Sequence, residues 1–162
     1  MENKKNKKEP KGILYMMCGM PGSGKSTLAT NIIKKQPEIK YVSRDTIRLT
    51  MVSDQAHFFD KESDVYREFC NQISMYLQQG KAVIADATHL TKKSRQKLLN
   101  NIYPPASVRC VYMRIPFKVA FARNAARKGI TRVPDDQMYK MKNRFQPPSP
   151  SEGFDLIYTV NG

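Results

Sequence analysis

Residues 19–27 read GMPGSGKST and match the pattern G-x-x-x-x-G-K-[ST] at Gly19, Gly24, Lys25 and Ser26. The glycines allow a tight turn whose backbone N–H groups point at phosphate oxygens. Lys25 adds a mobile positive charge for the β- and γ-phosphates, and Ser26 offers a hydroxyl to Mg²⁺. A helix beginning in the motif directs its positive N-terminal end at the same anion. The stretch therefore predicts a site for ATP or another nucleoside triphosphate, with Mg²⁺.

The residues on either side of this loop favour the same interpretation over a chance match. An apolar, strand-like run, ILYMMC, precedes the loop at residues 13–18, and a helical pattern, LATNII, follows it at residues 28–33. The motif requires this strand–loop–helix setting. The residues predicted to bind the nucleotide within the loop are Gly19, Pro21, Gly22, Ser23, Gly24, Lys25, Ser26 and Thr27.

Strand-like and helical patterns alternate along the chain. We expect strands at residues 13–18, 41–43, 82–85, 108–115 and 156–160. We expect helices at residues 25–35, 62–79, 92–102, 117–128 and 135–145. Such alternation predicts an α/β fold of the P-loop NTPase type, with a parallel sheet of about five strands and helices on both faces. Ligands of such sheets bind at the carboxyl ends of the strands.

Length and charge indicate one basic domain. The chain has 162 residues, and its 28 Lys and Arg against 14 Asp and Glu give a formal charge of +14. Residues 1–11 are rich in lysine and have no apolar face, so we expect a flexible basic arm there and a single domain over residues 12–162. The basic charge suggests a polyanionic partner, although charge alone is a weak argument.

Cysteine usage and hydropathy indicate the compartment. Cys18, Cys70 and Cys110 form no C-x-x-C pair, and we expect them to be small buried hydrophobes in a reducing environment. No apolar run approaches the roughly 20 residues that span a bilayer. The N-terminus lacks the apolar segment of a signal peptide. We therefore expect a cytoplasmic protein that does not associate with membranes.

Two carboxylates directly follow predicted strands. Asp45 could accept the proton of an attacking hydroxyl, or it could cap a short helix that follows it. Asp86 ends the run AVIAD and could hold Mg²⁺, or it could be an ordinary turn residue. His89 could hydrogen-bond in the site or be a plain loop histidine. No second histidine lies at ligand spacing from it, so we predict no zinc site.

Arg123 and Arg127 lie in the helix expected at residues 117–128. Residues four apart share one helix face, so two arginines could form a lid that clamps phosphates from above. The alternative is a solvated basic face. The phosphate-binding loop in the same domain favours the lid.

From about Leu14 to Met141 the sequence resembles the 5′-polynucleotide kinases, specifically the phage-type kinase domain of end-healing kinase/phosphatases. The matching blocks are the phosphate loop, R-D-x-x-R at residues 44–48, R-N-x-x-R at residues 123–127, Val133-Pro134 and Met138-Tyr139-Lys140. Many families share the first block. The second and third, in this order and spacing, are more specific.

The resemblance implies a role for several residues. Asp45 would be the general base for the acceptor's 5′-hydroxyl, and Arg48 would contact the phosphate next to that hydroxyl. Arg123 and Arg127 would act on the donor phosphates, together with Lys25. The residues implied for the acceptor side are Arg44, Asp45, Arg48, Asp86 and Thr88. Ser26 and Asp86 would hold Mg²⁺. Asparagine is common in the family where this chain has His89.

The sequence therefore predicts an ATP-dependent kinase domain at residues 12–162 that phosphorylates the 5′-hydroxyl of a DNA or RNA end. No fused phosphatase or ligase domain is present in the sequence, so we expect that complete end healing would need a separate partner. One alternative is a P-loop kinase for a small molecule or an aminoacyl-tRNA hydroxyl. Another is an NTP-binding regulatory switch. The choice between DNA and RNA, the donor base and the oligomeric state stay open at this level.

Overall fold

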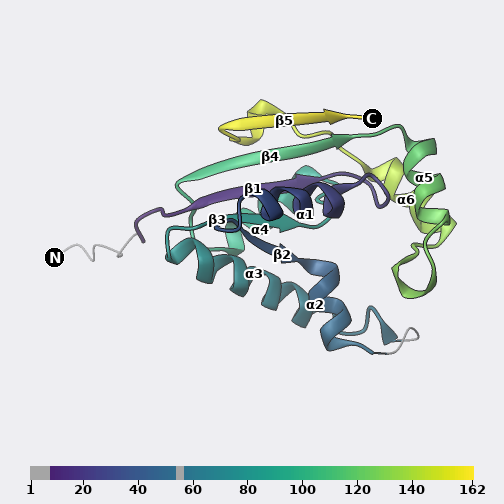
Figure 1. Ribbon diagram of the computed structural model, residues 1–162, viewed down its shortest axis with the longest axis horizontal. Coiled ribbons are helices and arrows are strands. Elements are labelled where there is room, and N and C mark those ends of the chain that lie inside the picture. Colours follow the sequence, from purple (N-terminus) through teal and green to yellow (C-terminus); the bar gives the residue numbers. More distant parts are fainter. Residues whose placement is uncertain (1–7, 54–56) are drawn as a thin grey trace.

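The computed structural model describes residues 8–53 and 57–162, and its centre is a parallel sheet of five strands (Figure 1). The strands are β1 (Ile13–Cys18), β2 (Lys40–Ser43), β3 (Ala82–Asp86), β4 (Ser107–Arg114) and β5 (Leu156–Asn161). Their order across the sheet is β2-β3-β1-β4-β5. All strands point the same way, so their carboxyl ends form one edge. The predicted α/β sheet is confirmed.

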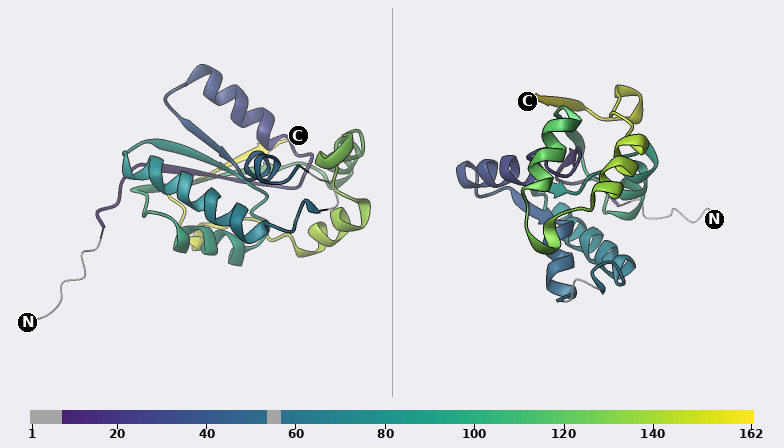
Figure 2. Two further views of the ribbon diagram at one scale, coloured as in Figure 1. Left: turned by 90° about the horizontal axis from the view of Figure 1, so that it is seen from below. Right: turned by 90° about the vertical axis from the view of Figure 1, so that its right-hand side faces the viewer.

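Helices cover both faces of the sheet, as predicted (Figure 2). The helices are α1 (Lys25–Lys35), α2 (Arg44–Met51), α3 (Glu62–Gln78), α4 (Lys92–Asn101), α5 (Phe117–Ala125) and α6 (Asp135–Arg144). One face packs against α1, and the opposite face packs against α3 and α4. Two further helices, α5 and α6, lie beyond the carboxyl ends of the strands (Figure 1). No helix of residues 8–53 and 57–162 is long and apolar enough to cross a membrane.

The strand order brings the ends of β1, β2 and β3 together. Its central strand, β1, runs directly into the phosphate loop, and β3 pairs with it on one side. At the end of β3, Asp86 is in register with Ser43, the last residue of β2. Residues that are far apart in sequence therefore meet beside the phosphate loop.

Residues at the N-terminal side contact the body of the domain. The Tyr103 hydroxyl donates to the Glu9 carbonyl at 2.7 Å, and the Lys11 N–H donates to the Pro104 carbonyl at 3.0 Å. Residues 1–7 of the predicted arm lie outside the described residues, so the arm stays a prediction. All three cysteines are buried and unpaired, as expected.

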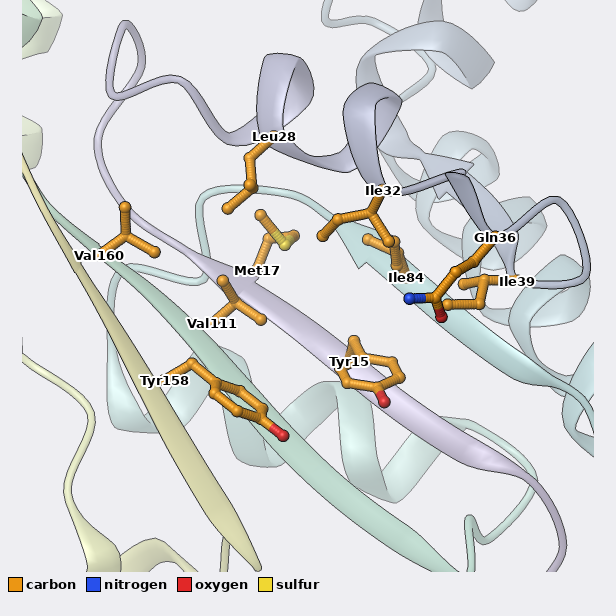
Figure 3. A pocket seen from close by; sticks show the side chains of 10 residues that line it. All are labelled: Tyr15, Met17, Leu28, Ile32, Gln36, Ile39, Ile84, Val111, Tyr158 and Val160. Carbon is orange, nitrogen blue, oxygen red and sulfur yellow. The ribbon is translucent and has the colours of Figure 1, made fainter. Parts of the chain in front are cut away.

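One apolar pocket of about 280 Å³ lies on the α1 face, where α1 leaves part of the sheet uncovered (Figure 3). Leu28 and Ile32 of α1 lie above it, and Tyr15, Val111 and Tyr158 of the sheet lie below. None of the described residues that line it carries a charge. This pocket is therefore unsuited to phosphate. The polar residues predicted to form the site lie instead at the carboxyl ends of the strands.

A buried ion pair fastens the C-terminal segment to the strand ends. Arg95 of α4 is only 1% exposed at its side chain, and its guanidinium donates to Glu152 at 2.7 Å and 3.0 Å. Arg95 also donates to the His89 carbonyl at 2.8 Å. Glu152 in turn accepts from the Ser149 N–H. Removing either charge would leave the other buried without compensation.

We predict that Glu152→Gln lowers the free energy of unfolding by about 3 kcal/mol, because it leaves the positive charge of Arg95 buried without a counter-charge. Urea denaturation of the wild-type and variant proteins measures this difference. The matched control is Glu38→Gln, at an exposed carboxylate, which should change stability by less than about 0.5 kcal/mol. Equal stability of the two variants would contradict the structural role of the Arg95–Glu152 pair.

Candidate active site

The phosphate loop connects β1 to α1, and two glycines allow its path. Gly24 occupies the position before α1 with φ of 92°, and Gly22 has φ of 82°. A Cβ atom on Gly22 would lie 2.2 Å from the Ala120 carbonyl oxygen, so the loop packs against the backbone of α5. Both glycines adopt left-handed conformations that other residues rarely tolerate. The GMPGSGKST motif thus forms the loop that the sequence predicted.

Polar groups inside the loop are suited to an anion. The Ser23 hydroxyl is buried and has no hydrogen-bond partner in the structure. Lys25 is 8% exposed, and its ammonium donates to the Met20 carbonyl at 2.9 Å. Burial lowers the pKa of Lys25, while the charge of Asp86 acts in the opposite direction. A buried cation beside an unpartnered hydroxyl fits phosphate oxygens, which supply both a negative charge and hydrogen-bond acceptors.

Asp86 lies within hydrogen-bond distance of the loop. The Ser26 hydroxyl donates to Asp86 Oδ2 at 2.7 Å, and the Tyr41 hydroxyl donates to the same oxygen. Burial and the negative charge of Asp86 raise the pKa of Tyr41 to about 12, so the phenol stays a donor. The two residues predicted to hold Mg²⁺ are therefore adjacent, and a hydroxyl with a carboxylate is a suitable pair of oxygen ligands for that ion.

Asp45 lies in the first turn of α2 and does not cap it. Ser43 is the cap, because its hydroxyl accepts from the Thr46 N–H at 3.2 Å. The alternative interpretation of Asp45 as the helix cap is therefore wrong. Its side chain is 81% exposed and accepts one hydrogen bond from Arg48. Asp45 thus points a carboxylate outward at the edge where the strands end.

Glu62, at the start of α3, organises the arginines around Asp45. Its Oε1 accepts from Arg44 at 2.6 Å and from Arg48 at 2.7 Å, and its Oε2 accepts from Arg48 Nε at 2.9 Å. Burial alone would raise the pKa of Glu62, but the hydrogen bonds and charges of Arg48 and Arg44 outweigh it and lower the pKa. Glu62 was not predicted from the sequence to belong to the site. An acidic residue in the first turn of a helix is ordinarily explained by its favourable interaction with the helix dipole.

The two arginines assigned to a lid both lie near the phosphate loop. Arg123 Nη1 would be 3.9 Å from a Cβ atom placed on Gly24. Arg127 lies close enough to Lys25 for its positive charge to help lower the pKa of that lysine. The predicted shared helix face is wrong, since α5 ends at Ala125 and Arg127 follows it.

Asn124 connects the last turn of α5 to the segment that follows the helix. This side chain is fully buried, and its amide donates to the Val133 carbonyl at 2.7 Å and accepts from the Val133 N–H at 3.0 Å. These two hydrogen bonds hold residue 133 against α5, so the chain has to turn back after the helix. A buried asparagine cannot be distinguished from a surface one by sequence alone.

Thr88 and His89 support the loop from the neighbouring strand end. The Gly19 N–H donates to the Thr88 carbonyl at 3.0 Å. His89 is buried with φ of 45°, and its Nδ1–H donates to the Met17 carbonyl at 2.6 Å. Burial lowers the pKa of His89 to about 4, although its bond to Met17 acts in the opposite direction. His89 is therefore neutral, and it holds the end of β1 through its hydrogen bond to Met17.

Comparison with known proteins gives the family. A family model described as an AAA domain matches residues 14–148, and the chain belongs to this family. No curated protein matches the chain. Among solved structures, a sugar kinase from Janibacter sp. HTCC2649 is 18% identical with a TM-score of 0.65, over 94% of this chain and 86% of that one.

Two RNA-related structures are also similar. A fungal RNA kinase is 14% identical with a TM-score of 0.67, over 93% of this chain and 74% of that one. A chain of the Pnkp1/Rnl/Hen1 RNA repair complex is 22% identical with a TM-score of 0.67, over 86% of this chain and 46% of that one. At these identities the likeness shows the fold, which is that of a P-loop kinase.

We predict that the unfolding free energy falls by about 2 kcal/mol between pH 7 and pH 5, because His89 binds a proton only after unfolding. The ordinary pKa of 6.5 applies to the unfolded chain and a pKa of about 4 to the folded one, so stability rises with pH between these values. Urea denaturation at pH 5, 6 and 7 measures the slope.

His89→Asn should flatten this slope, since asparagine does not titrate and tolerates a positive φ. His57→Asn, at the exposed histidine, is the control and should keep it. An unchanged slope in His89→Asn would show that His89 is not held neutral in the folded protein.

Proposed function

We propose that this protein is an ATP-dependent kinase that transfers the γ-phosphate to the 5′-hydroxyl of a polynucleotide. The observation that carries the proposal is the pairing of exposed Asp45 with buried Arg48, at the same sheet edge as the phosphate loop. A carboxylate that can take a proton and a cation that can bind a phosphate are thereby side by side. A regulatory switch has no need of such a pair.

On the donor side, the Ser23 hydroxyl, the Lys25 ammonium and the loop N–H groups would bind the β- and γ-phosphates. Ser26 and Asp86 would hold Mg²⁺, which when bound neutralises charge on the phosphates. Arg123 and Arg127 would add positive charge where negative charge develops on the transferred group. Gly19, Pro21, Gly22, Gly24 and Thr27 complete the proposed nucleotide site.

On the acceptor side, Asp45 would accept the proton of the attacking 5′-hydroxyl. Arg48 donates three hydrogen bonds, two to Glu62 and one to Asp45. A guanidinium has five N–H donors, so two remain for a phosphate oxygen of the acceptor. Glu62 thus fixes Arg48, and Arg48 fixes the carboxylate of Asp45. Arg44, Asp86 and Thr88 would complete the proposed acceptor site.

The basic charge of +14 and the likeness to a fungal RNA kinase support a polynucleotide acceptor. A second candidate is a kinase for a small hydroxyl compound, which the likeness to a sugar kinase of comparable length favours. The two candidates share the donor site and differ in what Arg48 recognises. The experiment that separates them is incubation with labelled ATP and either 5′-hydroxyl oligonucleotides or sugars.

We predict that Asp45→Asn lowers kcat by about 10²- to 10⁴-fold, because the amide cannot accept a proton. Affinity for ATP should stay unchanged, since Asp45 is not part of the proposed donor site. Steady-state kinetics and direct nucleotide titration measure the two effects. Asp64→Asn, at another exposed carboxylate that pairs with an arginine three residues away, is the matched control. A loss of less than tenfold in Asp45→Asn would exclude it as the base.

We predict that the wild-type enzyme prefers a nucleoside 3′-monophosphate to the plain nucleoside, because only the former offers a phosphate to Arg48. Arg48→Ala should abolish most of that preference, whereas Arg67→Ala, at an exposed arginine of α3, should keep it. The ratio of kcat/KM values for the two acceptors is the measurement. Phosphorylation of sugars with no label on any 5′-hydroxyl oligonucleotide would overturn the polynucleotide assignment.

A further inference from the structure

A second, basic pocket of about 230 Å³ is lined by Arg44, which directly precedes Asp45, and by residues that follow β3. Three of its lining residues are cations from three different elements: Arg44 of α2, Lys97 of α4 and Arg144 at the end of α6. None of its described lining residues is an Asp or a Glu. Arg44 is paired with Glu62 outside the pocket, but the lining as a whole keeps a net positive charge, which favours an anionic occupant.

The ring of Tyr66 in α3 contacts two of these cations. The Lys97 ammonium lies 4.5 Å from the centre of the Tyr66 ring, and the Arg44 guanidinium carbon lies 5.1 Å from it. Cation–π contacts of this kind hold both cations over one ring. The ring therefore positions positive charge at the pocket without neutralising it.

Two residues that line this pocket each carry a buried donor without an adequate partner. Arg44 Nε is buried and makes no hydrogen bond. The Tyr66 hydroxyl is buried too, with only the weak thiol of Cys70 to interact with. Buried donors are nearly always paired in folded proteins, so two unpaired donors on residues that line one basic pocket favour an acceptor bound beside them. A phosphate oxygen accepts from both a guanidinium and a phenol.

The pocket is joined to the proposed acceptor site through one carboxylate oxygen. Glu62 Oε1 accepts from Arg44, which lines the pocket, and from Arg48, which pairs with Asp45. The pocket is also lined by Ala87, Thr88 and His89, the three residues that directly follow Asp86 at the end of β3. A strand whose 5′-hydroxyl lies at Asp45 and whose first phosphate lies at Arg48 would next reach this pocket.

We propose that the pocket formed by Arg44, Tyr66, Lys97 and Arg144 is a second phosphate subsite, which binds the phosphodiester one nucleotide further from the 5′ end of the acceptor. This inference rests on the proposed function and narrows it, because it makes strands of two or more phosphates the preferred acceptors. Phosphate contacts carry no base information, so the subsite would favour length over sequence.

The kinetic test compares two acceptors: a nucleoside 3′-monophosphate, and a dinucleotide that also carries a 3′-phosphate. We expect kcat/KM to be higher for the dinucleotide, and Lys97→Met and Arg144→Gln to reduce the ratio of the two values by about tenfold each, the size of one charged hydrogen bond. Lys93→Met removes the same charge from an exposed position of α4 outside the pocket, and it should leave the ratio unchanged. Equal ratios in the Lys97 and Lys93 variants would overturn the subsite.

A binding test separates failure of the subsite from failure of the proposed function. Fluorescence anisotropy with a labelled 5′-hydroxyl oligonucleotide gives the dependence of log Kd on log salt concentration. Lys97→Met should reduce the slope by about one, whereas Lys93→Met should not. If no 5′-hydroxyl is phosphorylated, the proposed function is wrong, and this slope still decides the subsite. Matching slopes for the two variants would overturn it.

Discussion

The arrangement of the site depends on Asp86, a carboxylate that is 5% exposed at the end of β3. A buried carboxylate is stable only if donors satisfy it. Ser26 from the phosphate loop and Tyr41 from β2 both donate to one of its oxygens. Because β3 lies between β1 and β2, this single group connects the phosphate loop to β2, which leads into Asp45. The ends of three parallel strands thus contribute to one site.

Charge is distributed asymmetrically around this group. The cations Lys25 and Arg48 are buried and fixed by hydrogen bonds, whereas Asp45 is exposed. Fixed cations stabilise negative charge without having to reorganise when it develops. An exposed carboxylate stays reachable by a hydroxyl from outside. The geometry thus suits transfer of a phosphoryl group from a buried donor to an external acceptor.

Glu62 and Arg95 organise the site indirectly, because they bind residues around it. Glu62 draws Arg44 and Arg48 to one carboxylate, and Arg95 ties Glu152 to the carbonyl of His89. Neither Glu62 nor Arg95 belongs to a motif in the sequence. Both restrict the orientations of neighbouring side chains, so that the site adopts one geometry.

The sequence by itself determined the phosphate loop, the five strands and the side of the sheet where the site lies. These features follow from local patterns: glycines that permit positive φ, apolar runs, and a motif whose residues are neighbours in the chain. Only the folded structure decided that Ser43 rather than Asp45 caps α2, that Asn124 binds Val133, and that Glu62 holds Arg48. The last two depend on which side chains form hydrogen bonds once separate segments are packed together. Hydrogen bonds between distant residues leave no periodicity in the sequence, and so they could not be predicted from it.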